Sequence, residues 1–193
     1  ATLNKDDKEK YRKLSMDLSM LTLQFDQNAL KDKNRFELLI TDENELSGLP
    51  ESARDAAAML AKSKDKNGWL FNLSAPSYIP FMRYSDKRDL REKMYREYMS
   101  VGNKGDEFDN KDIIKKIVNI RLEIAQLMGF KNYAEYALEH TMAKNSANVY
   151  KLLNQLLEAY KPIAINEYNA VEGFALGTCL LYTSPSPRDR QKS

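Results

Sequence analysis

Histidine and cysteine are almost absent from this sequence. Its 193 residues include one histidine, His140, and one cysteine, Cys179. A single cysteine excludes a disulfide within the chain and fits a reducing compartment. A single histidine excludes a two-histidine metal motif within the chain. The pair Glu139-His140 has no second histidine at helical spacing, because Lys144 and Asn145 stand there. We therefore expect His140 to be a surface residue near a helix end.

Long apolar runs and phosphate-binding loops are missing as well. No window is long and apolar enough for a membrane helix, and the first ten residues have no signal-peptide core. Gly102 and Gly105 lie in the segment 101–108, but the strand before and the Lys-Ser/Thr pair after a P-loop are lacking. We expect an exposed loop there. Because the first residue is not Met, a targeting segment upstream stays open.

Neither sign of charge is in large excess. The chain has 30 Lys and Arg against 28 Asp and Glu, a net charge of +2. Residues 179–193 hold Arg188, Arg190 and Lys192 against Asp189, which is 3 − 1 = +2, so residues 1–178 are neutral. A neutral body with interspersed charges gives no electrostatic reason to expect nucleic acid or an anionic membrane as a partner.

The last fifteen residues differ from everything before them. Helical periodicity gives way to a Ser, Pro and basic string, CLLYTSPSPRDRQKS. The part from Cys179 to Asp189 resembles an in-frame translation of a transposon-type sequencing-library adapter; the alternative is a natural Pro-rich tail. We treat 179–193 as a disordered, adapter-derived tail and leave it out of the fold. We then expect residues 1–178 to be the helical part of an incomplete fold.

Apolar residues recur at helical spacing over most of the chain, and two short runs read as strands. The runs are 36–40 and 69–73, the second launched by the turn pair Asn67-Gly68. The expected fold is therefore mainly α, a multi-helix lobe with a minor two-stranded β-ribbon. No repeat of thirty to fifty residues is found, which gives no support to a solenoid.

Capping residues and prolines predict where the helices begin and end. Asp6 or Asp7 should cap a first helix that runs to about Ala29, with a core face of Leu14, Leu18, Leu21 and Phe25. Asp42 with Glu45 has capping-box spacing. Pro50 should start an Ala-rich helix, Pro80 a short one, and Ser85 or Asp86 should cap the next, which runs to about Val101.

The second half of the chain has the same kinds of signal. Asp109 with Asp112 should cap a helix that ends at Gly129, and Asn132 a short one to His140. Ser146 should cap the last helix, which Pro162 should kink rather than end. The buried seam expected for the first of these helices consists of Ile113, Ile117, Ile120, Ile124 and Leu127.

One group of side chains suggests binding. Arg88 and Arg91 stand near Tyr84 and Tyr95, where they can hold a substrate carboxylate or stack on the rings. The simpler interpretation is a helix with charged flanks and i,i+4 pairs. Nothing else in the sequence forms a catalytic, cofactor-binding or metal-binding set.

Three stretches carry a resemblance to a known family. They are TDENELSGLPESARDAAA, GWLFNLSAPSYIPFMRYSDKRDLREKMY and DNKDIIKKIVNIRLEIAQLMGFKNYAEYALEHTMA. In order and spacing they resemble the thimet oligopeptidase family of zinc metallopeptidases, and within it most nearly the bacterial peptidyl-dipeptidases (dipeptidyl carboxypeptidases). The resemblance covers about Asp6 to Ala175.

The resemblance implies a mostly helical hydrolase with two lobes beside a deep channel that admits short peptides. A single zinc would be held by HExxH and a downstream Glu, and the Glu between the histidines would act as general base. No position of this chain matches those ligands, so we expect it to be an N-terminal-half fragment that lacks the C-terminal catalytic lobe. Alone it should bind no zinc and cleave no peptide.

Further expectations follow from the same resemblance. The parent should release C-terminal dipeptides from short peptides, in the cytoplasm of a bacterial-type cell or in the periplasm. The last helix, and part of the Ile113 seam, should expose apolar surface that the missing lobe covers. The alternative is a non-catalytic helical interaction module, which predicts that the reading frame stops near residue 175.

Overall fold

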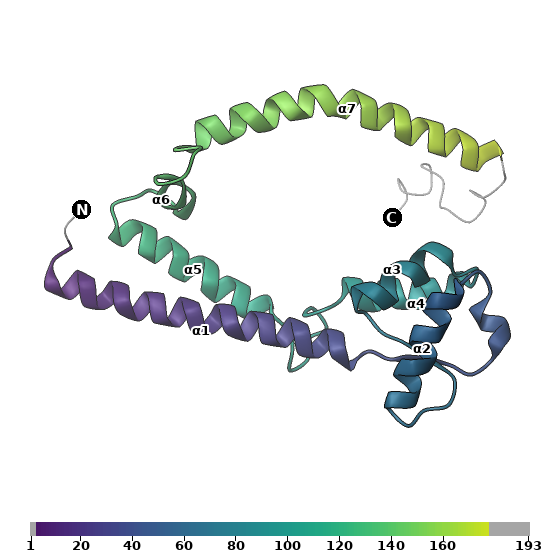
Figure 1. Ribbon diagram of the computed structural model, residues 1–193. Helices are drawn as coiled ribbons and strands as arrows, with labels where there is room; N and C mark the ends of the chain where they lie inside the picture. Colours follow the sequence, from purple (N-terminus) through teal and green to yellow (C-terminus); the bar gives the residue numbers. More distant parts are fainter. Residues whose placement is uncertain (1–2, 178–193) are drawn as a thin grey trace, which may run out of the picture. The chain divides into compact units, whose positions relative to one another are not determined.

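The computed structural model describes residues 3–177, and within them most of the chain is helical (Figure 1). The chain forms two compact units, Ala1–Gly129 and Phe130–Ser193. The tail expected at 179–193 lies outside the described residues. The elements in order are α1 (Lys5–Arg35), β1 (Leu38–Ile40), η1 (Glu43–Leu46), α2 (Glu51–Ser63), β2 (Trp69–Phe71), α3 (Ala75–Tyr84), α4 (Arg88–Met99), α5 (Lys111–Leu127), α6 (Tyr133–Leu138) and α7 (Ser146–Gly177).

The predicted β-ribbon is present in the first unit. β1 and β2 pair antiparallel, with Leu38 opposite Phe71 and Ile40 opposite Trp69. Gly68, just before β2, lets the chain pass close to the end of β1. It has a φ of +115°, and a Cβ there would lie 2.3 Å from the carbonyl oxygen of Ile40. The ribbon confirms the expected fold class, with shorter strands than the two runs suggest.

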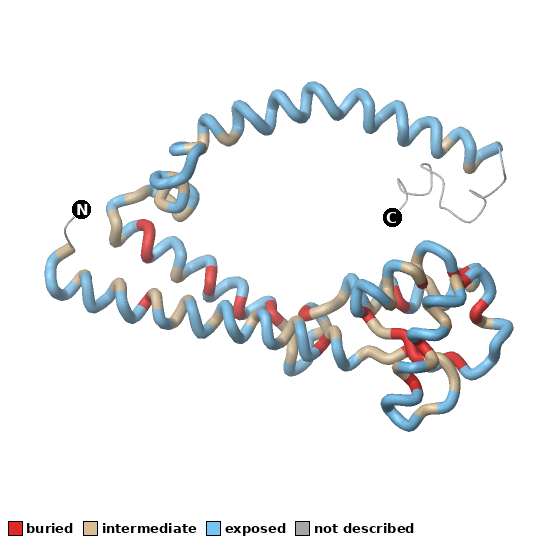
Figure 2. The backbone as a smooth tube through the Cα atoms, viewed as in Figure 1, coloured by how far each residue is buried: buried red, intermediate tan, exposed pale blue. Residues whose placement is uncertain are grey.

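The ribbon packs with η1, α2, α3 and α4 around a small apolar core, and Figure 2 shows buried segments gathered in this part of the chain. Phe71 and Phe81 meet edge to face with their ring centroids 4.8 Å apart. Tyr78 of α3 stacks on Tyr98 of α4, with their ring centroids 4.3 Å apart. The buried members of this core are Leu38, Ile40, Leu46, Leu49, Ala57, Phe71, Leu73, Phe81 and Met94.

α1 and α5 form the second part of this unit. They pack along each other and run antiparallel, since Asn28 near the end of α1 contacts Asn110 just before α5 (Figure 1). Leu14 of α1 is buried, while Leu18, Leu21 and Phe25 are half-buried. On α5 the predicted seam is confirmed, with Ile113, Ile117 and Ile124 buried and Ile120 and Leu127 half-buried.

Several predicted boundaries of α1 and α3 are wrong. α1 is capped by Asn4, whose side chain accepts the N–H of Asp7, and it continues past Ala29 because no breaker precedes Phe36. α3 begins at Ala75, so Pro80 lies inside the helix instead of starting it. Pro76 lies in the first turn of α3. The N–H groups of a first turn have no partner within the helix, so a proline there removes no helical hydrogen bond.

The cap of α4 also differs from its prediction. The N-cap residue is Lys87, which supplies no side-chain cap. Ser85 instead accepts the N–H of Lys87 through its hydroxyl, and Asp86 accepts the hydroxyl of Ser47 at 2.6 Å. α4 ends at Met99, two residues before Val101. The Ser85 side chain therefore serves a local turn, and the Asp86 side chain serves a long-range contact with Ser47, so neither caps the helix.

The remaining boundaries are closer to expectation. Asp42 caps η1, although the element is a short 3-10 helix. Pro50 precedes α2 as expected. Gly129 follows α5 with a φ of +86°, which suits a glycine after a helix end. Asp109 accepts the N–H of Lys111 at 2.9 Å, but the N-cap residue of α5 is Asn110.

The second unit consists of α6 and α7. Asn132 caps α6 as predicted and accepts the N–H of Glu135, but the helix ends at Leu138, before His140. α7 is capped by Asn145, which accepts the N–H of Asn148, and not by Ser146. The helix continues through Pro162 as expected.

No residue of α7 is buried in this unit, although much of the helix is apolar (Figure 2). Its exposed large apolar side chains are Tyr150, Leu152, Leu153, Leu156, Leu157, Tyr160, Ile163, Ile165, Tyr168, Val171, Phe174 and Leu176. α5 exposes Ile114, Val118 and Leu122 beside its buried seam. Over the described residues, none of the helices is long and apolar enough to cross a membrane.

Candidate functional site

The one histidine lies on the surface. The side chain of His140 is 90% exposed, and its Nε2 lies 3.7 Å from Oε2 of Glu139. Cys179 lies outside the described residues. Within residues 3–177, no three His, Cys, Asp or Glu side chains are grouped to hold a metal ion. These residues do not fit a zinc site, so no catalytic step can be derived from a metal on this part of the chain.

The arginine and tyrosine group found in the sequence is partly brought together. Arg88, Arg91 and Tyr95 of α4 line one hollow of about 440 Å³, to which Met82 of α3 also contributes. Tyr84 does not line it; Arg83 lies over the Tyr84 ring, 5.2 Å from its centroid. The simpler interpretation is correct in part, because Arg96 forms an i,i+4 pair with Glu92 at 2.7 Å.

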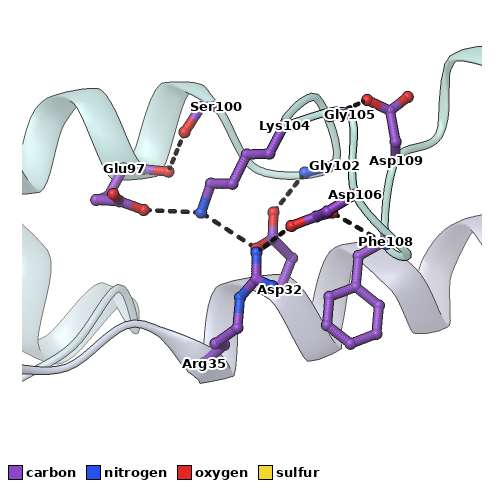
Figure 3. A network of polar contacts seen from close by, with 10 residues as sticks. All are labelled: Asp32, Arg35, Glu97, Ser100, Gly102, Lys104, Gly105, Asp106, Phe108 and Asp109. Carbon is purple, nitrogen blue, oxygen red and sulfur yellow. Dashed lines mark hydrogen bonds and ion pairs between the residues drawn. The ribbon is translucent and has the colours of Figure 1, made fainter.

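A polar network at the end of α1 was not predicted from the sequence (Figure 3). Asp32 is completely buried, and its carboxylate receives three donors from different places in the chain. The backbone N–H of Gly102 donates at 2.8 Å, the guanidinium of Arg35 at 2.7 Å and the ammonium of Lys104 at 3.1 Å. One buried carboxylate thus ties the loop after α4 to α1.

The cations of this network have further partners. Arg35 also bonds Asp106 at 2.6 Å, and Lys104 also bonds Glu97 at 2.7 Å. These bonds spread each positive charge over two carboxylates. A buried charge is tolerated only when it is paired in this way, so the network is internally satisfied.

The pKa shifts agree with this pairing. Burial by itself raises the pKa of Asp32, but the Gly102 N–H, Lys104 and Arg35 outweigh it, and the pKa lies below its ordinary value. Burial likewise lowers the pKa of Lys104, yet Glu97 and Asp32 bring it above the ordinary value. Asp106 raises the pKa of Arg35. Every shift favours the charged form, which is typical of a structural ion cluster.

Asn110 extends the same junction between α1 and the loop. Its side chain donates to the carbonyl of Phe25 at 3.1 Å and accepts from Asn28 at 3.1 Å. Its backbone N–H donates to the carbonyl of Gly102 at 2.8 Å. The loop 101–108 is therefore not wholly exposed as expected, because Gly102 is buried against Asn110 and Asp32.

The sequence held one usable signal for Asp32. The buried and half-buried positions of α1 include Leu14, Leu18, Leu21 and Phe25, at intervals of four, three and four. Continuing that face by three and four residues leads through Asn28 to Asp32. A carboxylate that falls on the core face of a helix predicts a buried pair, even inside the charged string KDKNR.

Another hollow in the first unit runs between α1 and α5. It measures about 590 Å³ and is lined mainly by Met20, Leu21, Leu23, Gln24 and Ile120. Its walls are mostly apolar side chains and neutral amides. Asp17 and Lys116 are its charged lining residues, while the other seven are apolar or neutral amides, so most of the hollow suits a covering apolar surface.

Comparison with known proteins decides the family. The sequence model of peptidase family M3 matches residues 81–181, just over half of the chain. The chain belongs to peptidase family M3. This confirms the resemblance found in the sequence, and the matched segment contains α4, α5, α6 and α7.

Individual relatives refine the picture of this M3 chain. It is 38% identical to oligopeptidase A of Haemophilus influenzae, over 89% of this chain and 26% of that protein. It is 38% identical to a probable cytosolic oligopeptidase A of Arabidopsis thaliana, over 90% of this chain and 25% of that protein. It is 29% identical to the dipeptidyl carboxypeptidase of Escherichia coli, over 89% of this chain and 25% of that protein.

Two facts follow from these comparisons. The M3 chain spans about a quarter of the length of the curated relatives it matches. It also shares more identity with the oligopeptidases A than with the dipeptidyl carboxypeptidase, so the expectation of a nearer likeness to peptidyl-dipeptidases was wrong.

Proposed function

We propose that this M3 chain is part of a larger zinc metallopeptidase that hydrolyses short peptides, and that it supplies helical scaffold without catalytic groups. The observation that carries the proposal is the 38% identity to oligopeptidase A over 89% of this chain but 26% of the relative. A likeness that is nearly complete on one side and a quarter on the other is what a portion of such an enzyme would give.

In the proposed enzyme the zinc ligands and the general base lie outside this sequence. Zinc would supply Lewis-acid activation of the attacking water. The residues of this chain would contribute none of that chemistry, because His140 is its one histidine and lies on the surface. Their role would be to build the wall of a channel that limits access to short peptides.

The surface of α7 supports a scaffold role. Leu153, Leu156, Tyr160 and Ile163 follow one another at intervals of three, four and three, and their exposed fractions range from 43% to 63%. An apolar stripe of this length on a helix is normally covered in a folded protein. We propose that the missing lobe of the parent covers it, together with Ile114 and its neighbours on α5.

The mode of cleavage and the compartment belong to the same proposal. Release of C-terminal dipeptides is the mode implied by the first resemblance, whereas the stronger likeness to oligopeptidases A favours cleavage within an oligopeptide. We propose a cytoplasmic location, which the probable cytosolic relative supports, with the periplasm as the alternative.

Reading the genomic frame downstream of codon 178 tests the proposal. We expect it to continue into HExxH and a downstream Glu. The full-length protein should then hydrolyse a short peptide and lose that activity to a metal chelator, while the 193-residue chain should hydrolyse none. A stop codon near residue 175, or metal-dependent hydrolysis by the 193-residue chain, would contradict the proposal.

A matched pair of substrates separates the two modes of cleavage. A peptide with a free C-terminus and the same peptide with an amidated C-terminus should be cut at the same internal bond by an oligopeptidase. A dipeptidyl carboxypeptidase should release a dipeptide from the free acid alone. Mass spectrometry of the products identifies the bond.

One further function has an observation in its favour. The exposed stripe of α7 also suits a helical interaction module that binds an amphipathic partner helix. That function predicts the early stop codon, so the same genomic reading decides between the two.

A further inference from the structure

We propose that the hollow beside α4 is a binding site for the C-terminal carboxylate of a short peptide, with Arg88 as its main ligand. Arg88, Arg91, Tyr95 and Arg96 of α4 line the hollow, with Met82 of α3. The inference rests on the proposed function in one respect, because peptides are the expected substrates of the parent.

The hollow carries an excess of positive charge. Glu92, the acidic residue lining the hollow, has its Oε1 held by Arg96, by Nε at 2.8 Å and by Nη2 at 2.7 Å. Arg91 donates to the carbonyl oxygen of Ser85, a bond that positions the guanidinium without neutralising it. Two guanidinium charges therefore face the hollow without an acidic partner.

Arg88 is the arginine of the hollow that is most open to a ligand. Among the residues that the structure describes, Arg88 makes no hydrogen bond or ion pair, and its side chain is exposed. Asp89 is next to it in the chain, but neighbouring side chains on a helix do not face each other. A guanidinium presents a planar fork of N–H donors that matches a carboxylate. Arg88 has that fork available.

The hollow also has an apolar part. The ring of Tyr95 is 50% exposed, and Met82 adds a flexible thioether beside it. Such a surface accepts an apolar or aromatic side chain next to the bound carboxylate. The arrangement therefore fits the last residue of a peptide that ends in a bulky side chain, better than it fits a free inorganic anion.

The test uses the 193-residue chain and two acetylated tripeptides ending in phenylalanine, one a free acid and one an amide. Backbone amide shifts are followed by NMR at about 0.15 M salt, where weak long-range attraction is screened. We expect saturable shifts centred on residues 88–96, with the amide peptide binding at least about tenfold more weakly. A charge-assisted contact is typically worth a change of that size.

Two variants sharpen the test. Arg88→Gln should weaken binding of the acid by about tenfold or more, since it removes the bidentate donor from an exposed position where folding is not at risk. Arg83→Gln is the matched control, because it removes the same charge from a nearby arginine that lies outside the hollow. Tyr95→Ala should reduce the preference for a peptide that ends in phenylalanine over one that ends in glycine.

Equal binding of acid and amide would overturn the inference, and so would equal losses in the two arginine variants. Shifts that fall away from α4 would overturn it as well. These outcomes are independent of the proposed function, because an active full-length peptidase whose fragment shows no carboxylate binding refutes only the inference. Carboxylate binding by a chain whose frame stops early refutes only the proposed function.

Discussion

Replacing Asp32 with alanine should be among the most damaging single changes in the first unit. The side chain is completely buried, and its removal takes the acceptor away from the buried N–H of Gly102 and from two cations. An unpaired buried donor and an unbalanced charge both destabilise the folded state. The expected effect is on unfolding, since no chemistry is attributed to this site.

The magnitude follows from the partners that remain. Removing one member of a buried ion pair typically costs about 3–5 kcal/mol. Lys104 would keep Glu97 and Arg35 would keep Asp106, so the loss should lie near the lower value, about 3 kcal/mol. Since a domain has about 5–15 kcal/mol of stability, this is a large fraction of the total.

Urea unfolding followed by the fluorescence of Trp69 measures this loss, because Trp69 is the one tryptophan and belongs to the first unit. Because the unfolding free energy falls by about 1–3 kcal/mol per M of urea, the urea concentration at the unfolding midpoint should fall by roughly 1–3 M. Asp26→Ala is the matched control, an exposed aspartate on the same helix, and should change the stability by less than about 0.5 kcal/mol. Equal shifts for the two variants would refute the reasoning.

The same carboxylate should make stability depend on pH. The pKa of Asp32 is lower in the folded chain than its ordinary value of 3.8, so the unfolded chain takes up the proton more readily. The stabilisation is complete above that ordinary value and is lost as the pH falls below it, through the folded pKa. Asp32→Asn should be less stable at neutral pH and should show a smaller further loss in acid. A loss in acid as large as that of the unchanged chain would contradict the assignment.

Three other changes test separate parts of the structure. Gly48→Ala should cost about 2 kcal/mol or more, because its φ is +83° and a Cβ would lie 2.1 Å from the carbonyl oxygen of Tyr84. Gly105→Ala is the control, with a similar φ of +73° but no atom within 4 Å, and urea unfolding should give about 1 kcal/mol for it. Leu156→Glu on α7 should change the unfolding free energy of the first unit by less than about 0.5 kcal/mol, and it should lower the binding of an apolar fluorescent dye. A large loss of stability would show that the Leu156 side chain is already covered. Glu37→Gln removes a carboxylate whose pKa is lowered by its two lysine partners, Lys64 and Lys66. Because these pairs are partly exposed, the loss in unfolding free energy at neutral pH should stay below about 1 kcal/mol, and it should shrink as the pH falls below 4.5. A loss that is unchanged in acid would refute the pairing.

The sequence was sufficient for elements that local rules determine. Periodicity predicted the long helices, the two β-like runs predicted the ribbon, and Asn67-Gly68 marked the start of its second strand, because side-chain spacing and glycine conformation act over a few residues. Asn132 and Gly129 were recognised for the same reason. The start of α3 was missed because Pro76 and Pro80 both suit a helix start, and only the packing of the whole helix decides between them.

The polar junction was missed because its members are far apart in the chain. Asp32 and Gly102 are separated by 70 residues, and the string around Asp32 is otherwise polar and mostly exposed. Local rules assign such a string to solvent. Only the position of Asp32 on the apolar face of α1 distinguishes it from the exposed Lys31 and Asn34, and that face becomes meaningful once α5 is known to pack there.

α7 illustrates the opposite relation between pattern and partner. Its apolar spacing predicts a helix, and the helix runs from Ser146 to Gly177 and continues through Pro162. Yet Leu153, Leu156 and Tyr160 are all more than two-fifths exposed, so nothing in its unit uses the stripe that the pattern describes. Periodicity reports that a face is suited to burial, because the spacing aligns apolar groups, but the identity of the covering surface depends on residues elsewhere. A stripe that is regular in sequence and uncovered in its own unit is therefore suited to a partner surface, and under the proposed function that surface would belong to the same protein.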